Sequence, residues 1–176
     1  ATLEGYLFPD TYYLARGSND LRLIEVMLKR FSQVALPAWK NRATKHLSFH
    51  EVITLASIVE REARIPSERP LIAGVFLNRL KIRMPLGSDP TVEYALGRHQ
   101  NEKGLSLRDI QVASPYNTYK YAGLPPGPIA CPGLASIQAV LHPESTSYLY
   151  FVARGDGSHH FSKTLGEQIR AQRRYQ

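Results

Sequence analysis

Cysteine is nearly absent from this chain of 176 residues, since Cys131 is the only one. One cysteine excludes an internal disulfide and any metal site built from several thiolates. The six histidines are not paired with acids at ligand spacings, and His159 and His160 would point to opposite faces of a strand. Phosphate-binding glycine loops, serine nucleophile elbows and metalloprotease helices are also missing. We therefore expect a chemistry that needs no metal and no cofactor.

Long apolar runs are lacking as well. No segment approaches the ~20 apolar residues that a membrane-spanning helix requires, and the first residues carry no cleavable signal pattern. Hydrophobic residues make up 43% of the chain and charged residues 21%, a mixture typical of globular proteins. The length suffices for one domain with a substantial core but not for two ordinary domains. The sequence therefore predicts a single domain over residues 1–176.

Acidic residues are too few to balance the basic ones. The chain has 15 acids against 22 lysines and arginines, which gives a net charge of +7. This balance favours an anionic partner or surface. The basic residues are nevertheless spread along the chain and are locally dense only at Arg170, Arg173 and Arg174. A nucleic-acid-binding domain gathers such residues in one patch, so we rank that alternative last and expect no nucleic-acid partner.

The hydrophobic pattern predicts helices in the middle of the chain and extended segments near both ends. Ser48 followed by Glu51 fits a capping box, which starts a helix through about residue 64. The other predicted helices cover about 18–34, 67–82, 90–97, 106–112, 133–141 and the residues after 164. The predicted extended segments are 3–15, 147–153 and 158–162. This order indicates an α+β fold, with central helices and a small antiparallel sheet built from the N- and C-terminal segments.

Residues 83–132 differ in composition from the rest of the chain. Glycine, proline, asparagine, tyrosine and threonine are frequent there, and hydrophobic periodicity extends over only a few residues at a time. Irregular segments of this length inside a compact domain usually line a functional cleft. We therefore expect long cleft-lining loops beside the central helices.

Glu60 is the first candidate for chemistry, because it ends the most apolar stretch of the chain, residues 52–59. A helix that is apolar on nearly every face is buried all round. A partly buried carboxyl group tends to keep its proton to higher pH, as a general acid requires. The alternative is a surface ion pair between Glu60 and Arg64, one helical turn later. Spacing alone does not choose between the two.

Two loop segments hold candidate sugar-binding groups. In segment 88–93, Asp89 before Pro90 fits a helix N-cap, and Glu93 would be favoured by the helix dipole, although a glycan hydroxyl could also be bound by Asp89. In segment 116–121, aromatic and amide side chains suit the ring faces and hydroxyls of sugars, but an ordinary half-buried turn explains them equally well. The candidate substrate-binding residues are Ser88, Asp89, Thr91, Glu93, Asn117, Thr118, Tyr119 and Tyr121.

Several motifs together resemble a known family. The segment Ala56-Ser57-Ile58-Val59-Glu60-Arg61-Glu62 is similar to the catalytic helix of YceG-like (MltG-type) endolytic murein transglycosylases. The opening Leu3-Glu4-Gly5-Tyr6-Leu7-Phe8-Pro9-Asp10 resembles the start of that family's catalytic domain. Further motifs follow in family order at 76–80, 88–92, 117–119, 123–129 and 148–152. The resemblance covers nearly the whole chain.

The resemblance implies that Glu60 is the catalytic acid, with Glu62 and Asn78 in supporting roles. The substrate would be the glycan strand of peptidoglycan, cut internally between N-acetylmuramic acid and N-acetylglucosamine. In such a reaction the muramoyl C6 hydroxyl attacks the anomeric carbon, so a single carboxyl group can donate one proton and accept the other. This role requires Glu60 to be neutral at rest, which we expect burial on the apolar helix to favour.

The resemblance also implies a place of action. Family members face the cell wall from the periplasmic side of the bacterial inner membrane and are thought to work with peptidoglycan synthases. We expect the membrane to be reached only through an N-terminal anchor, which is missing from this chain together with a small LysM-like subdomain. The alternative function is a non-catalytic peptidoglycan-binding module that uses the same aromatic cleft.

Overall fold

The computed structural model describes residues 2–98 and 104–175 of the chain. Over these residues it is an α+β fold, as predicted, in which helices predominate and two strands form one small antiparallel sheet. The helices are α1 (Asp20–Lys40), α2 (Phe49–Glu62), α3 (Arg69–Lys81), α4 (Asp89–Ala95), α5 (Leu134–Leu141) and α6 (Leu165–Tyr175). Two short 3-10 helices, η1 (Pro66–Glu68) and η2 (Asp109–Gln111), and the strands β1 (Tyr150–Ala153) and β2 (His159–Ser162) complete the order.

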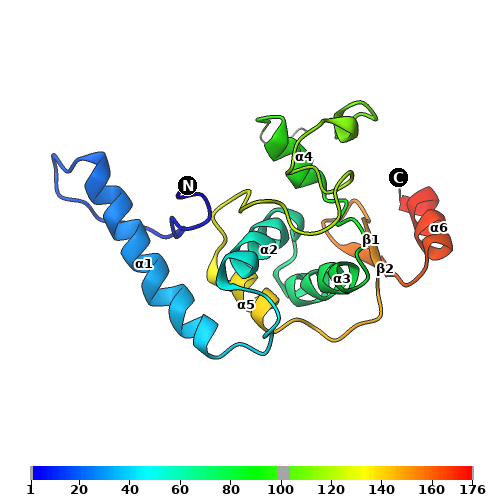
Figure 1. Cartoon of the computed structure of the whole chain (residues 1–176), viewed down its shortest axis with the longest axis horizontal. Coiled ribbons are helices and arrows are strands. Elements are labelled where there is room, and N and C mark those ends of the chain that lie inside the picture. Colours follow the sequence, from blue (N-terminus) through cyan, green and yellow to red (C-terminus); the bar gives the residue numbers. More distant parts are fainter. Residues whose placement is uncertain (1, 99–103, 176) are drawn as a thin grey trace.

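The core lies where α2, α3 and α5 pack together, at the centre of Figure 1. The capping box predicted at the start of α2 is present, since the Ser48 hydroxyl accepts from the Glu51 N–H and the Glu51 carboxylate accepts from the Ser48 N–H. Every residue from Val52 to Val59 is buried, as the apolar run predicts. The central helix is therefore fixed at its start by its cap and along its length by its neighbours.

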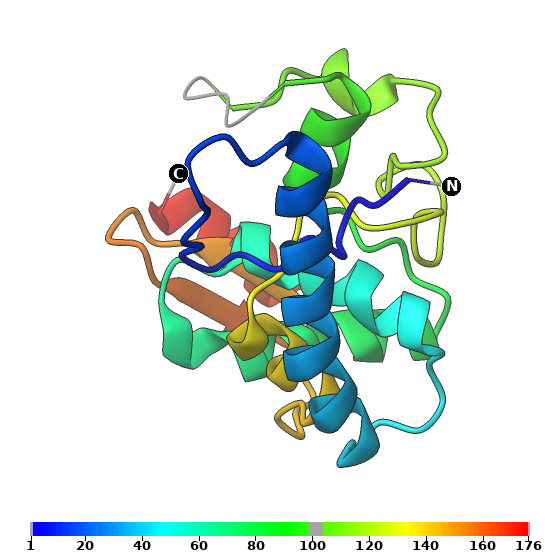
Figure 2. The same ribbon diagram turned by 90° about the vertical axis from the view of Figure 1, so that its left-hand side faces the viewer.

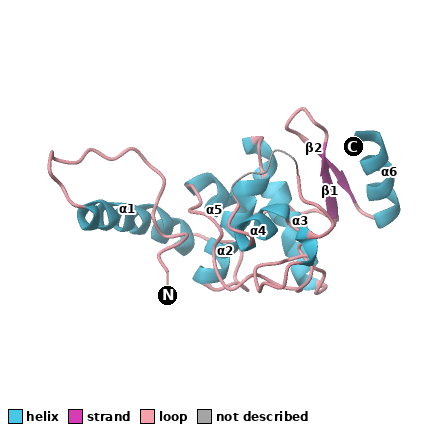
Figure 3. Ribbon diagram, turned by 90° about the horizontal axis from the view of Figure 1, so that it is seen from above, coloured by secondary structure: helices cyan, strands magenta, loops and turns pink. Residues whose placement is uncertain are grey.

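Helix α1 lies at one end of the molecule and the sheet at the other. Figures 1 and 3 show α1 on one side of the central helices, with β1, β2 and α6 on the opposite side, and Figure 2 shows α1 running across the face turned to the viewer. The α1 helix begins after Asn19, whose side chain accepts from the Arg22 N–H, and continues past the predicted end at residue 34 through Pro37. None of the described helices is long and apolar enough to cross a membrane.

The sheet contains only C-terminal strands, which corrects one detail of the prediction. β1 and β2 pair antiparallel with Tyr150 opposite Ser162 and Ala153 opposite His159, and α6 packs against them. Residues 3–15 were expected to add a strand but form turns and irregular backbone. Gly5 has φ of +87°, which interrupts an extended path. The aromatic side chains here pack into the fold instead: Phe8 is buried, and the ring of Tyr6 meets that of Phe31 in α1 edge to face.

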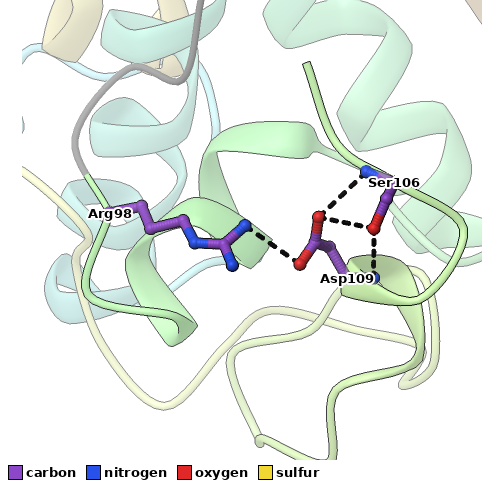
Figure 4. Close-up of polar contacts among 3 residues, drawn as sticks. All are labelled: Arg98, Ser106 and Asp109. Carbon is purple, nitrogen blue, oxygen red and sulfur yellow. Dashed lines mark hydrogen bonds and ion pairs between the residues drawn. The ribbon is translucent and has the colours of Figure 1, made fainter. Parts of the chain in front are cut away.

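The loops between α3 and α5 form a third region, seen above the core in Figure 1. The α4 helix begins this region, and η2 follows it. Arg98 Nη1 lies 2.9 Å from the Asp109 carboxylate, which also accepts from the N–H and hydroxyl of Ser106 (Figure 4). The two hydrogen bonds from Ser106 hold the pKa of Asp109 below its usual range. This network ties the end of the α4 segment to the η2 turn.

Candidate active site

A polar cleft of about 810 Å³ lies where the C-terminal end of α2 meets α4 and the β1–β2 hairpin. Ionisable side chains line much of this cleft, which distinguishes it from the smaller and more apolar hollow of about 450 Å³ formed by loop residues 113–126. The lining residues that carry charge or a titratable ring are Glu60, Arg61, Glu62, Arg64, Asp89, Glu93 and His159.

Glu60 lies in this cleft at the point where the buried run of α2 ends. Its side chain is 30% exposed, so Glu60 is partly buried, and the fully buried run of α2 ends one residue earlier at Val59. One carboxylate oxygen accepts the Gly133 N–H at 3.0 Å, and the other lies 3.5 Å from Arg69 Nη2. The alternative partner, Arg64, is exposed, and no ion pair joins it to Glu60 within the described residues.

Arg69 and Gly133 reach Glu60 from other parts of the chain. Arg69 is the first residue of α3, and its Nε also donates to the buried hydroxyl of Ser136 at 3.0 Å. Gly133 is the N-cap of α5. The Glu60 carboxylate therefore accepts a hydrogen bond from one of the N–H groups at the start of that helix that have no partner within the helix. A positive guanidinium and a helix N-terminus both attract negative charge. The Glu60 carboxylate is therefore held in one orientation in the cleft.

The acid of the site with a raised pKa is Glu62, which is half-buried and lines the cleft. Burial raises the pKa of the Glu62 carboxyl group to about 7, and the negative charges of Asp89 and Glu93 add to this effect. A hydrogen bond from the Ser88 hydroxyl, 2.6 Å from the carboxylate, acts in the opposite direction but is outweighed. A carboxyl group that burial makes keep its proton to higher pH is thus present at the end of α2, at Glu62.

We expect the protein to lose stability between about pH 4.5 and pH 7 because of Glu62. In this range the unfolded chain releases a proton that folded Glu62 keeps, so folding becomes less favourable as the pH rises. The loss should reach a few kcal/mol at most and level off above pH 7. Urea unfolding at pH 5 and pH 8 measures it, and Glu62→Gln should be the more stable form at pH 8. If the free energy of unfolding depends on pH equally in wild type and Glu62→Gln, Glu62 is not the cause of the loss. Glu144→Gln, at an exposed position, serves as the control.

Four of the predicted substrate-binding residues are interior residues. Ser88, Thr91, Asn117 and Thr118 are at most 2% exposed. The Thr118 hydroxyl bonds both the Ser88 N–H and the Thr91 hydroxyl, while the Asn117 amide donates to the carbonyls of Ile110 and Val112. We expected these side chains to contact a sugar directly. Side chains that are buried in this way are not accessible to a sugar in the cleft. They join the 114–121 loop to the start of α4 and so fix the cleft wall.

The other predicted residues are placed differently. Asp89 lines the cleft, but it is the first residue of α4 and not its N-cap, and its carboxylate accepts from the Tyr119 hydroxyl. Burial, and next this hydrogen bond, raise the pKa of Tyr119 well above its usual range. Glu93 lines the cleft 3.5 Å from Arg61. Tyr121 lines the separate loop hollow instead.

Asn78 supports the fold and is not among the residues that line the cleft. Its amide nitrogen donates to the Thr146 carbonyl at 2.8 Å and to the Tyr148 carbonyl at 3.1 Å. These bonds tie α3 to the segment that leads into β1. The supporting role implied for Asn78 is therefore structural: it places the hairpin whose far end lines the cleft.

Sequence reasoning missed His159 and its partner Glu68. His159 Nδ1 lies 2.7 Å from the Glu68 carboxylate, whose other oxygen accepts the His159 N–H at 3.0 Å. The two residues are far apart in sequence, so no spacing rule points to them. As predicted, His159 and His160 lie on opposite faces, since His160 packs against Tyr175 of α6. Within the described residues no group of three or more histidines, cysteines or acids is arranged to hold a metal ion.

Comparison with known proteins places this site in a family. Residues 1–174 match the YceG-like family. The chain is 45% identical over 175 residues to the endolytic murein transglycosylase of Bacillus subtilis strain 168, covering 98% of this chain and 48% of that protein. It is 40% identical over 154 residues to the endolytic murein transglycosylase of Streptococcus pneumoniae serotype 2 strain D39, covering 86% of this chain and 28% of that protein. It thus spans about half the length of the Bacillus relative and less of the other.

A solved structure agrees with this match. The fold superposes on the crystal structure of a putative YceG-like protein from Listeria monocytogenes with a TM-score of 0.83 and 42% sequence identity. The superposition covers 96% of this chain and 55% of that one. Sequence and fold therefore agree over almost every described residue. The chain belongs to the YceG-like family.

Proposed function

We propose that this chain is the catalytic part of an endolytic peptidoglycan lytic transglycosylase, with Glu60 as its general acid. The relatives named as endolytic murein transglycosylases support the reaction class. The observation that carries the proposal is the Glu60 carboxylate, which lies in a cleft of about 810 Å³ between the Gly133 N–H and Arg69. A cleft of this size accommodates sugar rings, and its polar lining suits their hydroxyl groups.

The proposed reaction breaks the bond between C1 of N-acetylmuramic acid and O4 of N-acetylglucosamine. Glu60 protonates the leaving O4, and the muramoyl C6 hydroxyl attacks C1 to close a 1,6-anhydro ring. The Glu60 carboxylate can then accept the proton of that hydroxyl. Arg69 and the N-terminus of α5 support this second state, because both suit a negative carboxylate. Two-carboxylate glycosidases instead need a second acid to activate water or to act as a nucleophile.

The place of action follows from the substrate. We propose that the protein works outside the cytoplasm, on the wall side of the bacterial inner membrane, because peptidoglycan strands lie there. Association with peptidoglycan synthases and attachment through an N-terminal anchor remain predictions. Co-purification of the complete protein with a synthase after membrane solubilisation tests the first of these.

The products of digestion test the proposed function. Purified sacculi are incubated with the complete protein, and the released fragments are analysed by mass spectrometry. We expect muropeptides with 1,6-anhydro ends, which are lighter by one water than reducing ends. Reducing ends would identify a hydrolase and contradict the proposed reaction. Binding to sacculi without any soluble product would identify the non-catalytic module.

A further inference from the structure

The cleft holds a second ionisable group whose geometry is as well defined as that of Glu60. His159 is 8% exposed, lines the cleft, and bonds the Glu68 carboxylate through Nδ1 at 2.7 Å. An ionised carboxylate can only accept hydrogen bonds, so Nδ1 carries the proton. The lone pair of a neutral imidazole is then on Nε2.

Nε2 of His159 is left available to the cleft. Within the described residues no side chain or backbone group forms a hydrogen bond with this nitrogen. The buried polar atoms without a partner do not include it, so it is accessible from the cleft. The ring is fixed on its other sides by Phe151, with centroids 5.3 Å apart and nearly perpendicular planes, and by Phe161. A histidine held by a carboxylate at Nδ1 and free at Nε2 has the arrangement of a general base.

Two consecutive residues hold both candidate groups. Glu68, the last residue of η1, orients His159, and Arg69, the first residue of α3, contacts Glu60. The two ionisable groups therefore share one rigid support at the junction of η1 and α3. This placement keeps their relative position fixed, which a pair of proton-transfer groups requires.

We infer that His159, oriented by Glu68, is the second proton-transfer group of this cleft and, in place of the Glu60 carboxylate, accepts the proton of the attacking sugar hydroxyl. The inference rests on the proposed function. Glu60 gives its proton to the leaving O4 as the C1–O4 bond breaks, the hydroxyl oxygen O6 forms the new bond to C1, and the O6 proton passes to Nε2. Glu60 then regains a proton from solvent and His159 returns one, so the net reaction is unchanged.

Variants of the complete protein on soluble, uncross-linked glycan strands test this inference. His159→Gln should lower kcat by about 100-fold, with KM changed by only a few fold, because proton transfer and not binding is lost. In Glu68→Gln the amide oxygen can still accept one hydrogen bond from His159, but the negative charge beside the imidazole is lost. This variant should lower kcat by about 10-fold. The matched control is His160→Gln, on the opposite face of the same strand, which should retain the wild-type rate.

A merely structural role for His159 gives a different set of results. Added imidazole should restore part of the activity of His159→Ala if a base is missing, whereas it cannot repair a displaced hairpin. The inference would be overturned if wild type gives anhydro products and folded His159→Gln keeps at least a third of the wild-type kcat. Glu60 would then be the single acid/base. If His159→Gln unfolds, Glu68→Gln decides: unchanged kcat in the folded variant overturns the inference. Absence of anhydro products from wild type would instead contradict the proposed function.

Discussion

Glu60→Gln is expected to lower the rate of anhydromuropeptide release by about 10²–10⁴-fold, the range that loss of a general acid or base usually causes. Glutamine has nearly the same shape, and its amide oxygen can still accept the Gly133 N–H that the carboxylate accepts at 3.0 Å. The fold should therefore be retained while the transferable proton is removed. Release from purified sacculi, followed by chromatography and mass spectrometry, measures the effect, and thermal unfolding verifies the fold.

The control for this variant is another acid-to-amide change. Glu144 is exposed and lies outside the cleft, so Glu144→Gln should release products at the wild-type rate. Wild-type release by Glu60→Gln would show that Glu60 is not the acid. A large loss in Glu62→Gln with none in Glu60→Gln would move the acid role to Glu62, whose pKa is raised to about 7 by burial.

Phe76→Ala is expected to cause the largest loss of stability, about 3–5 kcal/mol, as is usual for a fully buried phenylalanine. Phe76 is 0% exposed in α3, and its ring meets that of Phe151 edge to face with centroids 5.6 Å apart. Phe151 in turn contacts His159. The substitution should therefore leave a cavity and loosen the contact between α3 and the hairpin. Urea unfolding monitored by circular dichroism measures the loss.

Leu107→Ala provides the comparison for Phe76→Ala. Leu107 is 84% exposed, so its removal should change the free energy of unfolding by less than about 0.5 kcal/mol. A loss below about 1 kcal/mol in Phe76→Ala would mean that the α3–hairpin contact closes over the missing ring. At temperatures where Phe76→Ala remains folded, its catalytic rate should still fall if the hairpin contributes to the cleft.

Much of the fold was predictable from local signals. The Ser48–Glu51 capping box and the apolar run after it predicted α2 correctly, because a helix buried all round carries its periodicity and its cap in adjacent residues. The N-terminal segment was not predicted correctly. Its aromatic residues favour strands, but its turn at Gly5 and its packing on α1 depend on tertiary contacts that no local pattern encodes.

The site was predictable only in part. Resemblance to the family pointed to Glu60, and the cleft position of Glu60 fits that prediction, but its role remains a proposal. Burial distinguished residues that looked equivalent in sequence: Thr118 is enclosed while Tyr121 is exposed. Gly133, which bonds Glu60, and His159, which bonds Glu68, lie more than 70 residues from their partners, so these contacts depend on how the helices and the hairpin pack. Spacing rules reach only across neighbouring turns or strands.

The wide separation of the cleft walls along the chain has a consequence for biosynthesis. Glu60 and its helix leave the ribosome before the hairpin, since His159 and the hairpin follow only after α5 has been made. A growing chain therefore carries the acid well before it carries the opposite wall of the cleft. Domains generally complete their packing as units once their last elements are available. The cleft is thus expected to take its final form only when the hairpin has docked against α3, after the last helices of the domain have been made.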